Sequence, residues 1–165
     1  MKHYSFPRQL WALSGVLVGM VLLFASAASA QVPSIEGTYQ LISRTLPDGT
    51  VLKPPDILGL QTYTKGYRNF NILSKDAEGK FVSRHIVATY TLTPTEYTEI
   101  TLFHIFVRGQ EIRHELAAQP QRSAVTVDAG RLQFERPVEQ RVTVFEGNKF
   151  TSTSARNVDV WEKVQ

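Results

Sequence analysis

From Ile35 to the end of the chain, short hydrophobic runs rich in Thr, Val, Ile, Phe and Tyr are separated by turn residues. Such runs are typical of β-strands, and no long segment shows the spacing of an amphipathic helix. Gly, Pro, Asn and Asp in the turns favour tight hairpin connections. The pattern predicts strands over about residues 35–44, 59–64, 67–75, 81–93, 96–107, 122–128, 131–136, 140–146 and 149–164, the last of them bent.

Two segments need separate interpretation. Residues 53–58, KPPDIL, favour one helical turn, because proline suits the first turn of a helix and aspartate suits its N-terminal end. In residues 108–121, Ile112 and Leu116 fit helical spacing, but together with His114 they also alternate. Because the neighbouring segments are strands, we predict a strand there.

A series of eight to ten strands joined by tight turns predicts an up-and-down antiparallel sheet. A sheet of this length hides its edges by closing on itself, so we predict an all-β, up-and-down antiparallel barrel over residues 31–165. A barrel of about eight strands has room for a row of side chains or one small ligand. The alternative is a two-sheet sandwich, which usually needs longer crossovers between its sheets.

The turn spacing also predicts which residues face one another across the sheet. If Thr93 lies opposite Glu96, the same register places His85 directly across from His104. The preceding turn places Phe70 opposite His85. The central hairpins would therefore bring two histidines and an aromatic ring onto one face.

The turn at residues 65–66 places Tyr63 against Arg68 in the same way. Of the two faces of this sheet, one carries Arg84 and Glu99, which suit water better than a barrel interior. We therefore assign the lumen to the other face, which carries Tyr63, Phe70, Ile72, His85, Val87, Thr89, Ile100, Leu102, His104 and Phe106.

The first thirty residues have the three parts of a secretory signal peptide. Lys2 and Arg8 form a basic start, an uncharged apolar run covers residues 10–24, and Ala28-Ser29-Ala30 provides a cleavage site. We expect cleavage after Ala30 and export to the periplasm or the exterior of a bacterial cell. The alternative is an uncleaved membrane anchor, since residues 10–28 are just long enough to span a bilayer.

Composition narrows the partners of the mature chain. Removal of residues 1–30 lowers the formal net charge from +3 to +1, because two basic residues and no acidic ones are lost. The remaining basic residues are scattered, which argues against nucleic acid. The chain contains no cysteine, so neither a disulfide nor a lipid-modified cysteine can hold the mature protein. One domain without a stable membrane anchor is expected.

No motif in the sequence predicts catalysis: Gly-x-Ser-x-Gly, His-Glu-x-x-His and a glycine-rich phosphate loop do not occur. His85 and His104 could share a zinc or a haem iron, but two ligands are too few for a structural zinc site. We therefore expect no metal and no cofactor, and a pair of hydrogen-bonded histidines instead.

Three patches of the mature chain carry a family likeness: GTYQLIS at 37–43 with DG at 48–49 and PP at 54–55, GLQTYTKG at 59–66, and DVWEK at 159–163. They resemble the bacterial lipocalin-like domain proteins of the calycin group. In lipocalins, the opening pattern is Gly-x-Trp, and the Trp closes the base of the barrel against a basic side chain from a late strand. Tyr39 stands at the Trp position, so the resemblance implies that its ring plugs one end of the barrel.

The resemblance implies a carrier rather than an enzyme. We expect a monomer that binds a small, mainly hydrophobic molecule in the lumen, with Arg156 as a counter-ion for a ligand carboxylate or as the basic partner near the barrel base. A solvent-facing strand is the alternative for residues 150–156. The expected ligand-binding residues are Tyr39, Tyr63, Phe70, His85, Leu102, His104 and Arg156.

Two other functions remain open. One is a barrel enzyme of the isomerase or cyclase type, for which His85 or His104 would be the acid or base. The other is a structural or interaction module of the cell envelope, whose barrel is filled by its own side chains. A lumen cavity of roughly a few hundred Å³ would favour a carrier or an enzyme, and a filled interior would favour the module.

Overall fold

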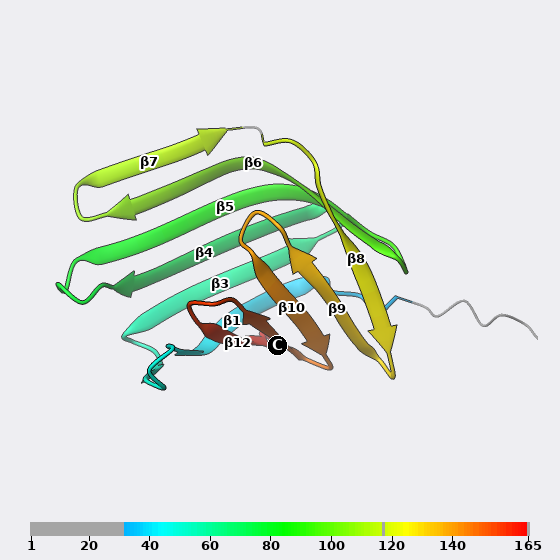
Figure 1. Ribbon diagram of the computed structural model, residues 1–165, viewed down its shortest axis with the longest axis horizontal. Helices are drawn as coiled ribbons and strands as arrows, with labels where there is room; N and C mark the ends of the chain where they lie inside the picture. The colour runs from blue at the N-terminus through cyan, green and yellow to red at the C-terminus, as the bar shows by residue number, and fades with distance from the viewer. Residues whose placement is uncertain (1–31, 117, 165) are drawn as a thin grey trace, which may run out of the picture.

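The structure is a computed structural model that describes residues 32–116 and 118–164 (Figure 1). The predicted signal peptide lies outside the described residues. Within them, no helix is long and apolar enough to cross a membrane. The strands are β1 (Gly37–Thr45), β2 (Val51–Leu52), β3 (Ile57–Thr64), β4 (Tyr67–Lys75), β5 (Phe81–Leu92), β6 (Glu96–Arg108), β7 (Glu111–Leu116), β8 (Gln121–Asp128), β9 (Arg131–Arg136), β10 (Arg141–Glu146), β11 (Lys149–Thr153) and β12 (Val158–Lys163).

Ten of these strands form a closed antiparallel ring. Their order is β1-β3-β4-β5-β6-β8-β9-β10-β11-β12, and β12 pairs with β1 to complete the ring. The short β2 pairs with β1, and β7 pairs with β6, so both lie beside the ring rather than in it. The predicted all-β antiparallel barrel is therefore confirmed, and the pairing of β1 with β12 excludes a sandwich with two open sheets.

The β6–β7 hairpin extends beyond the closed part of the barrel. β6 pairs with β8 only over Glu96–Glu99, and its second half pairs with β7 over Phe103–Arg108. In Figure 1, β7 is the outermost strand at the top of the flared sheet, away from β8. Every residue of β7 is exposed.

The two ambiguous segments are settled by backbone pairing. Residues 111–116 form β7, as predicted. The helical turn predicted for residues 53–58 is wrong: residues 54–56 form a turn with a cis Pro54–Pro55 bond, the amides of Asp56 and Ile57 donate to the carbonyl of Lys53 at 2.8 and 3.3 Å, and β3 begins at Ile57. The predicted bent last strand is instead two strands, β11 and β12, because Ser154 and Asn157 close a turn between them.

Gly37 and Lys163 explain the start of β1. Gly37 has a φ of 141°, and a Cβ at this position would overlap Cε of Lys163. The Lys163 ammonium lies 5.9 Å from the centroid of the Tyr39 ring, within the range of a cation–π contact. The basic side chain beside Tyr39 is thus Lys163 of the last strand, and Arg156 does not occupy that place.

Aromatic rings fill the closed part of the barrel. Tyr39 is 2% exposed, points inward as predicted, and lies 5.0 Å from Phe150 and 6.3 Å from Tyr63 between ring centroids. Phe150 stacks on Trp161 at 5.5 Å. Edge and stacked contacts of this kind stabilise beyond the area that they bury. The aromatic core is the connected set Tyr39, Phe70, Tyr63, Tyr90, Tyr97, Phe134, Phe145, Phe150 and Trp161.

The segment before β1 packs at one end of the barrel. The Tyr39 hydroxyl donates to the carbonyl of Ile35 at 3.1 Å, and Ile35 is itself buried in the core. Residues 32–36 lie beside Gly66 and Leu92, with an open depression of about 400 Å³ between them. Tyr39 and Ile35 together therefore occupy the interior at this end.

Candidate functional site

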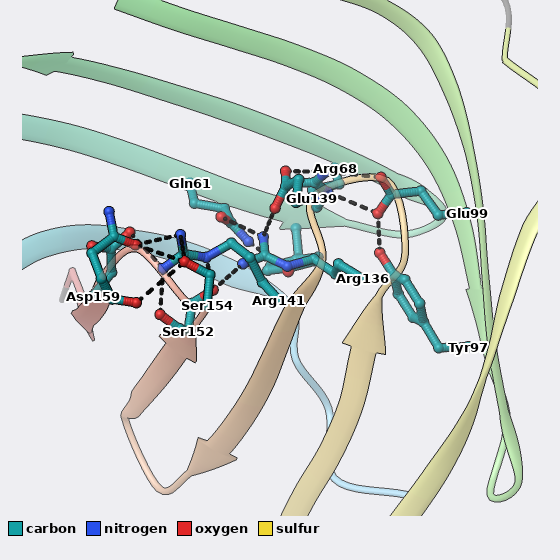
Figure 2. Close-up of polar contacts among 12 residues, drawn as sticks. Gln61, Arg68, Tyr97, Glu99, Arg136, Glu139, Arg141, Ser152, Ser154 and Asp159 are labelled. Atoms are coloured by element: carbon teal, nitrogen blue, oxygen red, sulfur yellow. Dashed lines mark hydrogen bonds and ion pairs between the residues drawn. The ribbon is translucent and has the colours of Figure 1, made fainter. Parts of the chain in front are cut away.

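Arg68 forms the polar centre of the barrel interior (Figure 2). Its side chain is 0% exposed, and its Nε and Nη2 donate to the two carboxylate oxygens of Glu99 at 2.9 and 2.8 Å. Nη2 also donates to Oε1 of Glu139 at 3.0 Å, and the Tyr97 hydroxyl donates to Glu99. A planar guanidinium can hold two oxygens of one carboxylate at once, so this geometry fixes both side chains.

Small neighbours let these side chains meet across the sheet. Arg68 on β4 is paired with Ala88 on β5, and Ala88 is paired with Thr101 on β6. Because Ala88 has only a methyl group, the guanidinium can extend over β5 toward Glu99. Glu139 comes from the β9–β10 turn, whose hydrogen bonds join residues 136–140 and bring its side chain to 3% exposure.

The charged cluster continues from Glu139 toward β12. Arg136 contacts Glu139 at 3.2 Å, donates to Gln61 at 3.2 Å, and donates to the Ser152 hydroxyl at 2.5 Å. Ser152 also accepts from Arg141 at 2.7 Å. Figure 2 shows these contacts as one chain across the interior. We call the set the buried ionic network: Arg44, Gln61, Arg68, Tyr97, Glu99, Arg136, Glu139, Arg141, Ser152 and Asp159.

The network holds ionised groups rather than a free acid or base. Burial alone would raise the pKa of Glu139, but Arg136 and Arg68 outweigh it and lower the pKa to about 2. Burial alone would lower the pKa of Arg68, and Glu139 and Glu99 raise it well above its ordinary value. Each of these groups is bound by opposite charges, which is the arrangement of a structural ion cluster.

The register of the central strands differs from the prediction. Tyr63 does face Arg68, as predicted. On β5 and β6, however, the predicted pairing holds only from Leu92 back to Ala88. A β-bulge between Val87 and Ala88 then shifts the register by one residue. The predicted pairing of β4 with β5 is also off by one, since Phe70 faces Ile86.

These shifts overturn part of the lumen assignment. His85 faces Ile105 rather than His104, and the two histidines do not form a pair. On β5 the inward side chains are Ile86, Ala88 and Tyr90, all buried, so His85, Val87 and Thr89 point outward. On the first half of β6, Tyr97, Glu99 and Thr101 are the buried positions, so Ile100 and Leu102 also point outward. A one-residue slip exchanges the two faces of a strand.

The seven predicted ligand-binding residues do not gather in one place. Tyr39, Tyr63 and Phe70 belong to the aromatic core. His104 lies on the inner face of the flared sheet, while His85 and Leu102 lie on the outer face. Arg156 is exposed in the turn between β11 and β12.

The two histidines have different surroundings. His85 hydrogen-bonds through Nδ1 to Asn71 at 2.9 Å and through Nε2 to Ser83 at 3.1 Å. Burial and the nearby Arg84 lower the pKa of His104, whose Nε2 has no hydrogen-bond partner among the described residues. Within residues 32–116 and 118–164, no group of three or more His, Cys, Asp or Glu residues is placed to hold a metal ion.

Sequence reasoning missed the buried ionic network, although one signal for it was present. Tyr63 was assigned to the lumen and to a position opposite Arg68, and directly opposed residues share a face of the sheet. Arg68 therefore had to point inward, and a buried arginine requires a buried carboxylate. The assignment of Glu99 to water was wrong because this carboxylate is the partner of Arg68.

The outer side of β3 to β7 carries a second feature, an apolar sheet face. Cross-strand pairing arranges it in three rows of five residues. Leu60 and Leu73 border a shallow depression of about 200 Å³ that also includes His85. We call this surface the outer apolar face: Leu58, Leu73, Ser83, Val107 and Ile112; Leu60, Asn71, His85, Ile105 and His114; Thr62, Asn69, Val87, Phe103 and Leu116.

The outer apolar face contains no Asp, Glu, Lys or Arg at any of these positions. Ile112 and Leu116 are 67% and 70% exposed, the largest values among the exposed large hydrophobic side chains of the described residues. The opposite face of the same hairpin carries Glu111, Arg113 and Glu115. The usual distribution, with charge outside and apolar groups inside, is therefore reversed at the flared end of the sheet.

Fold and sites together define a closed antiparallel β-barrel with an aromatic core, a buried ionic network and an uncharged apolar outer face. No protein-family model, no curated protein and no solved structure matches the chain.

Proposed function

We propose that this protein is an exported interaction module of the bacterial cell envelope, in which the barrel interior is structural and the outer apolar face binds a partner protein. The observation that carries the proposal is the uncharged, exposed face of β3 to β7. Contiguous exposed apolar patches often mark binding surfaces. The centres of protein interfaces are likewise depleted in charged residues.

The filled interior supports this function over a lumen carrier. The inward residues of the closed barrel are buried against one another, as rings in the aromatic core or as ions in the network. The 400 Å³ and 200 Å³ depressions both open at the surface. Residues 1–30 support export, because they have the parts of a signal peptide.

Photo-crosslinking in intact cells tests the proposal. A photoreactive amino acid in place of Leu60 or Leu73 lies on the outer apolar face, and one in place of Val142 lies on β10 at a comparable exposure of 40%. We expect a discrete adduct of higher mass from the first two positions only. Equal labelling from Val142, or no adduct from any position, would contradict the proposal.

A second candidate function is the binding of a small, mainly hydrophobic ligand with a polar head. This is the function that the lipocalin-like resemblance of the sequence implies. Arg68 Nη1, Thr101 Oγ1 and His104 Nε2 favour it, because these buried polar atoms have no partner among the described residues and lie on the inner sides of β4 and β6. Buried polar atoms require a hydrogen-bond partner. Native mass spectrometry of the purified protein should then show a retained ligand that Thr101→Val reduces, and an unliganded mass would rule out this candidate.

A further inference from the structure

The free edge of β7 has a feature that the proposed function does not use. β6 occupies one edge of β7, and within the described residues no strand pairs with the other edge. An unpaired strand edge presents amide and carbonyl groups that can pair with another strand. Proteins usually block such an edge with charged side chains, a bulge, a proline or a covering loop. β7 has the sequence EIRHEL, with no proline.

We propose that two copies of this protein pair through β7 in an antiparallel, two-fold symmetric way, so that His114 lies opposite the partner's His114. This inference goes beyond the proposed function, since it concerns the strand edge and not the outer apolar face. It also departs from the expectation of a monomer.

Symmetry limits the registers that β7 can adopt with a second copy. A two-fold axis perpendicular to the sheet places the outer faces of the two copies side by side. Directly opposed residues therefore have numbers that are both even or both odd. The axis then passes through a residue of β7: an axis at Arg113 or at His114 opposes five residues of the strand, and an axis at Ile112 or at Glu115 opposes three. Only the axes at Arg113 and His114 therefore give an overlap of most of the strand.

Charge selects between the two registers of greatest overlap. An axis at Arg113 opposes two arginines and also opposes Glu111 to Glu115, which are like charges. An axis at Glu115 opposes two glutamates. An axis at His114 opposes Arg113 to Glu115 on both sides of the axis. Directly opposed unlike charges stabilise a strand pair, and like charges destabilise it.

The same register also covers the most exposed apolar side chains. With the axis at His114, Ile112 lies opposite Leu116 on the outer face of both copies. These two residues are 67% and 70% exposed in the single chain. Pairing would therefore shield them from water and join two outer apolar faces into one continuous surface. Because the paired strand is short, we expect a reversible dimer.

Sedimentation analysis of the mature chain over a range of concentrations tests the charge pairing. Arg113→Glu and Glu115→Arg should each abolish the dimer, because each change opposes like charges. The combined R113E/E115R variant should restore it, and Arg131→Glu, on exposed β9 surface, should not affect it. Arg113 and Glu115 side chains are 72% and 81% exposed, so none of these changes disturbs the core. A monomer at all concentrations, or a double variant that stays monomeric, would overturn the inference.

The absence of native cysteine provides a direct test of register. Opposed residues of an antiparallel pair have Cα separations within the range of a disulfide. On mild oxidation, His114→Cys should give a covalent dimer in much higher yield than Arg113→Cys or Glu115→Cys. The highest yield at either of the other two positions would overturn the proposed register. Crosslinking at Leu60, which tests the proposed function, does not depend on either outcome.

Discussion

The guanidinium of Arg68 lies fully buried between the carboxylates of Glu99 and Glu139, at distances of 2.8 to 3.0 Å. Bringing three charges out of water is unfavourable, and only close opposite charges and hydrogen bonds offset it. Such a cluster adds little net stability, but removal of one partner leaves an uncompensated buried charge. At the scale of single residues, the stability of the interior therefore depends on the presence of all three charged side chains.

Glu99→Gln tests this dependence. The substitution keeps the shape of the side chain but leaves Arg68 with one carboxylate instead of two, so we expect a loss of about 3 to 5 kcal/mol of unfolding free energy. Urea unfolding at neutral pH measures it. The matched control is Glu146→Gln on the exposed end of β10, which should change stability by less than about 0.5 kcal/mol. Equal effects of the two variants would contradict the structural role of Glu99.

Low pH should reduce the free energy of unfolding of the barrel through protonation of Glu139. Its folded pKa of about 2 lies below the ordinary value of 4.5, so its contribution to stability is complete above 4.5 and is lost as the pH falls through about 2. The unfolding free energy should decline across that window. In Glu139→Gln the decline should be shallower, since the titrating group is gone. Identical pH profiles for the two proteins would show that Glu139 is not held ionised by Arg68 and Arg136.

At the scale of elements, strand positions could be predicted because turn residues mark their ends and hydrophobic runs mark their interiors. The exact faces could not be predicted. The bulge near Ala88 adds one residue to β6 without any turn residue to mark it, and it moves His104 to the opposite face from His85. Glu99 was also assigned to water by the average preference of its residue type, which fails when a charge has a buried partner.

Close packing of β3 against β12 gives a test at this scale. A Cβ at Gly59 would lie 2.9 Å from Cη2 of Trp161 and 3.1 Å from Cβ of Leu41. Gly59→Ala should therefore reduce the unfolding free energy by about 1 to 3 kcal/mol through overpacking. The smaller ring in Trp161→Phe removes the closest contact, so Gly59→Ala should cost less in that background. The same cost in both backgrounds, measured by urea unfolding, would place Trp161 away from Gly59.

At the scale of the whole molecule, closure of the sheet was predictable because a long meander needs to protect its edges. The way in which side chains fill the interior could not be predicted, since the contacts of Arg68 and Arg136 join strands far apart in the sequence. The family likeness at Tyr39 indicated a plugged barrel, and the structure places Lys163 beside that ring. Because the aromatic core and the buried ionic network occupy the closed part of the barrel, we propose the outer apolar face as the binding surface.

Titration with an apolar, environment-sensitive dye tests this central claim most directly. The mature protein is compared with a Leu60→Lys/Leu73→Lys variant, in which two charges enter the outer apolar face and the interior is unchanged. The account predicts saturable dye binding to the wild type and at least about a tenfold weaker affinity in the variant, because apolar contact is replaced by charge. Undiminished binding in the variant would place the apolar site inside the barrel and contradict the account.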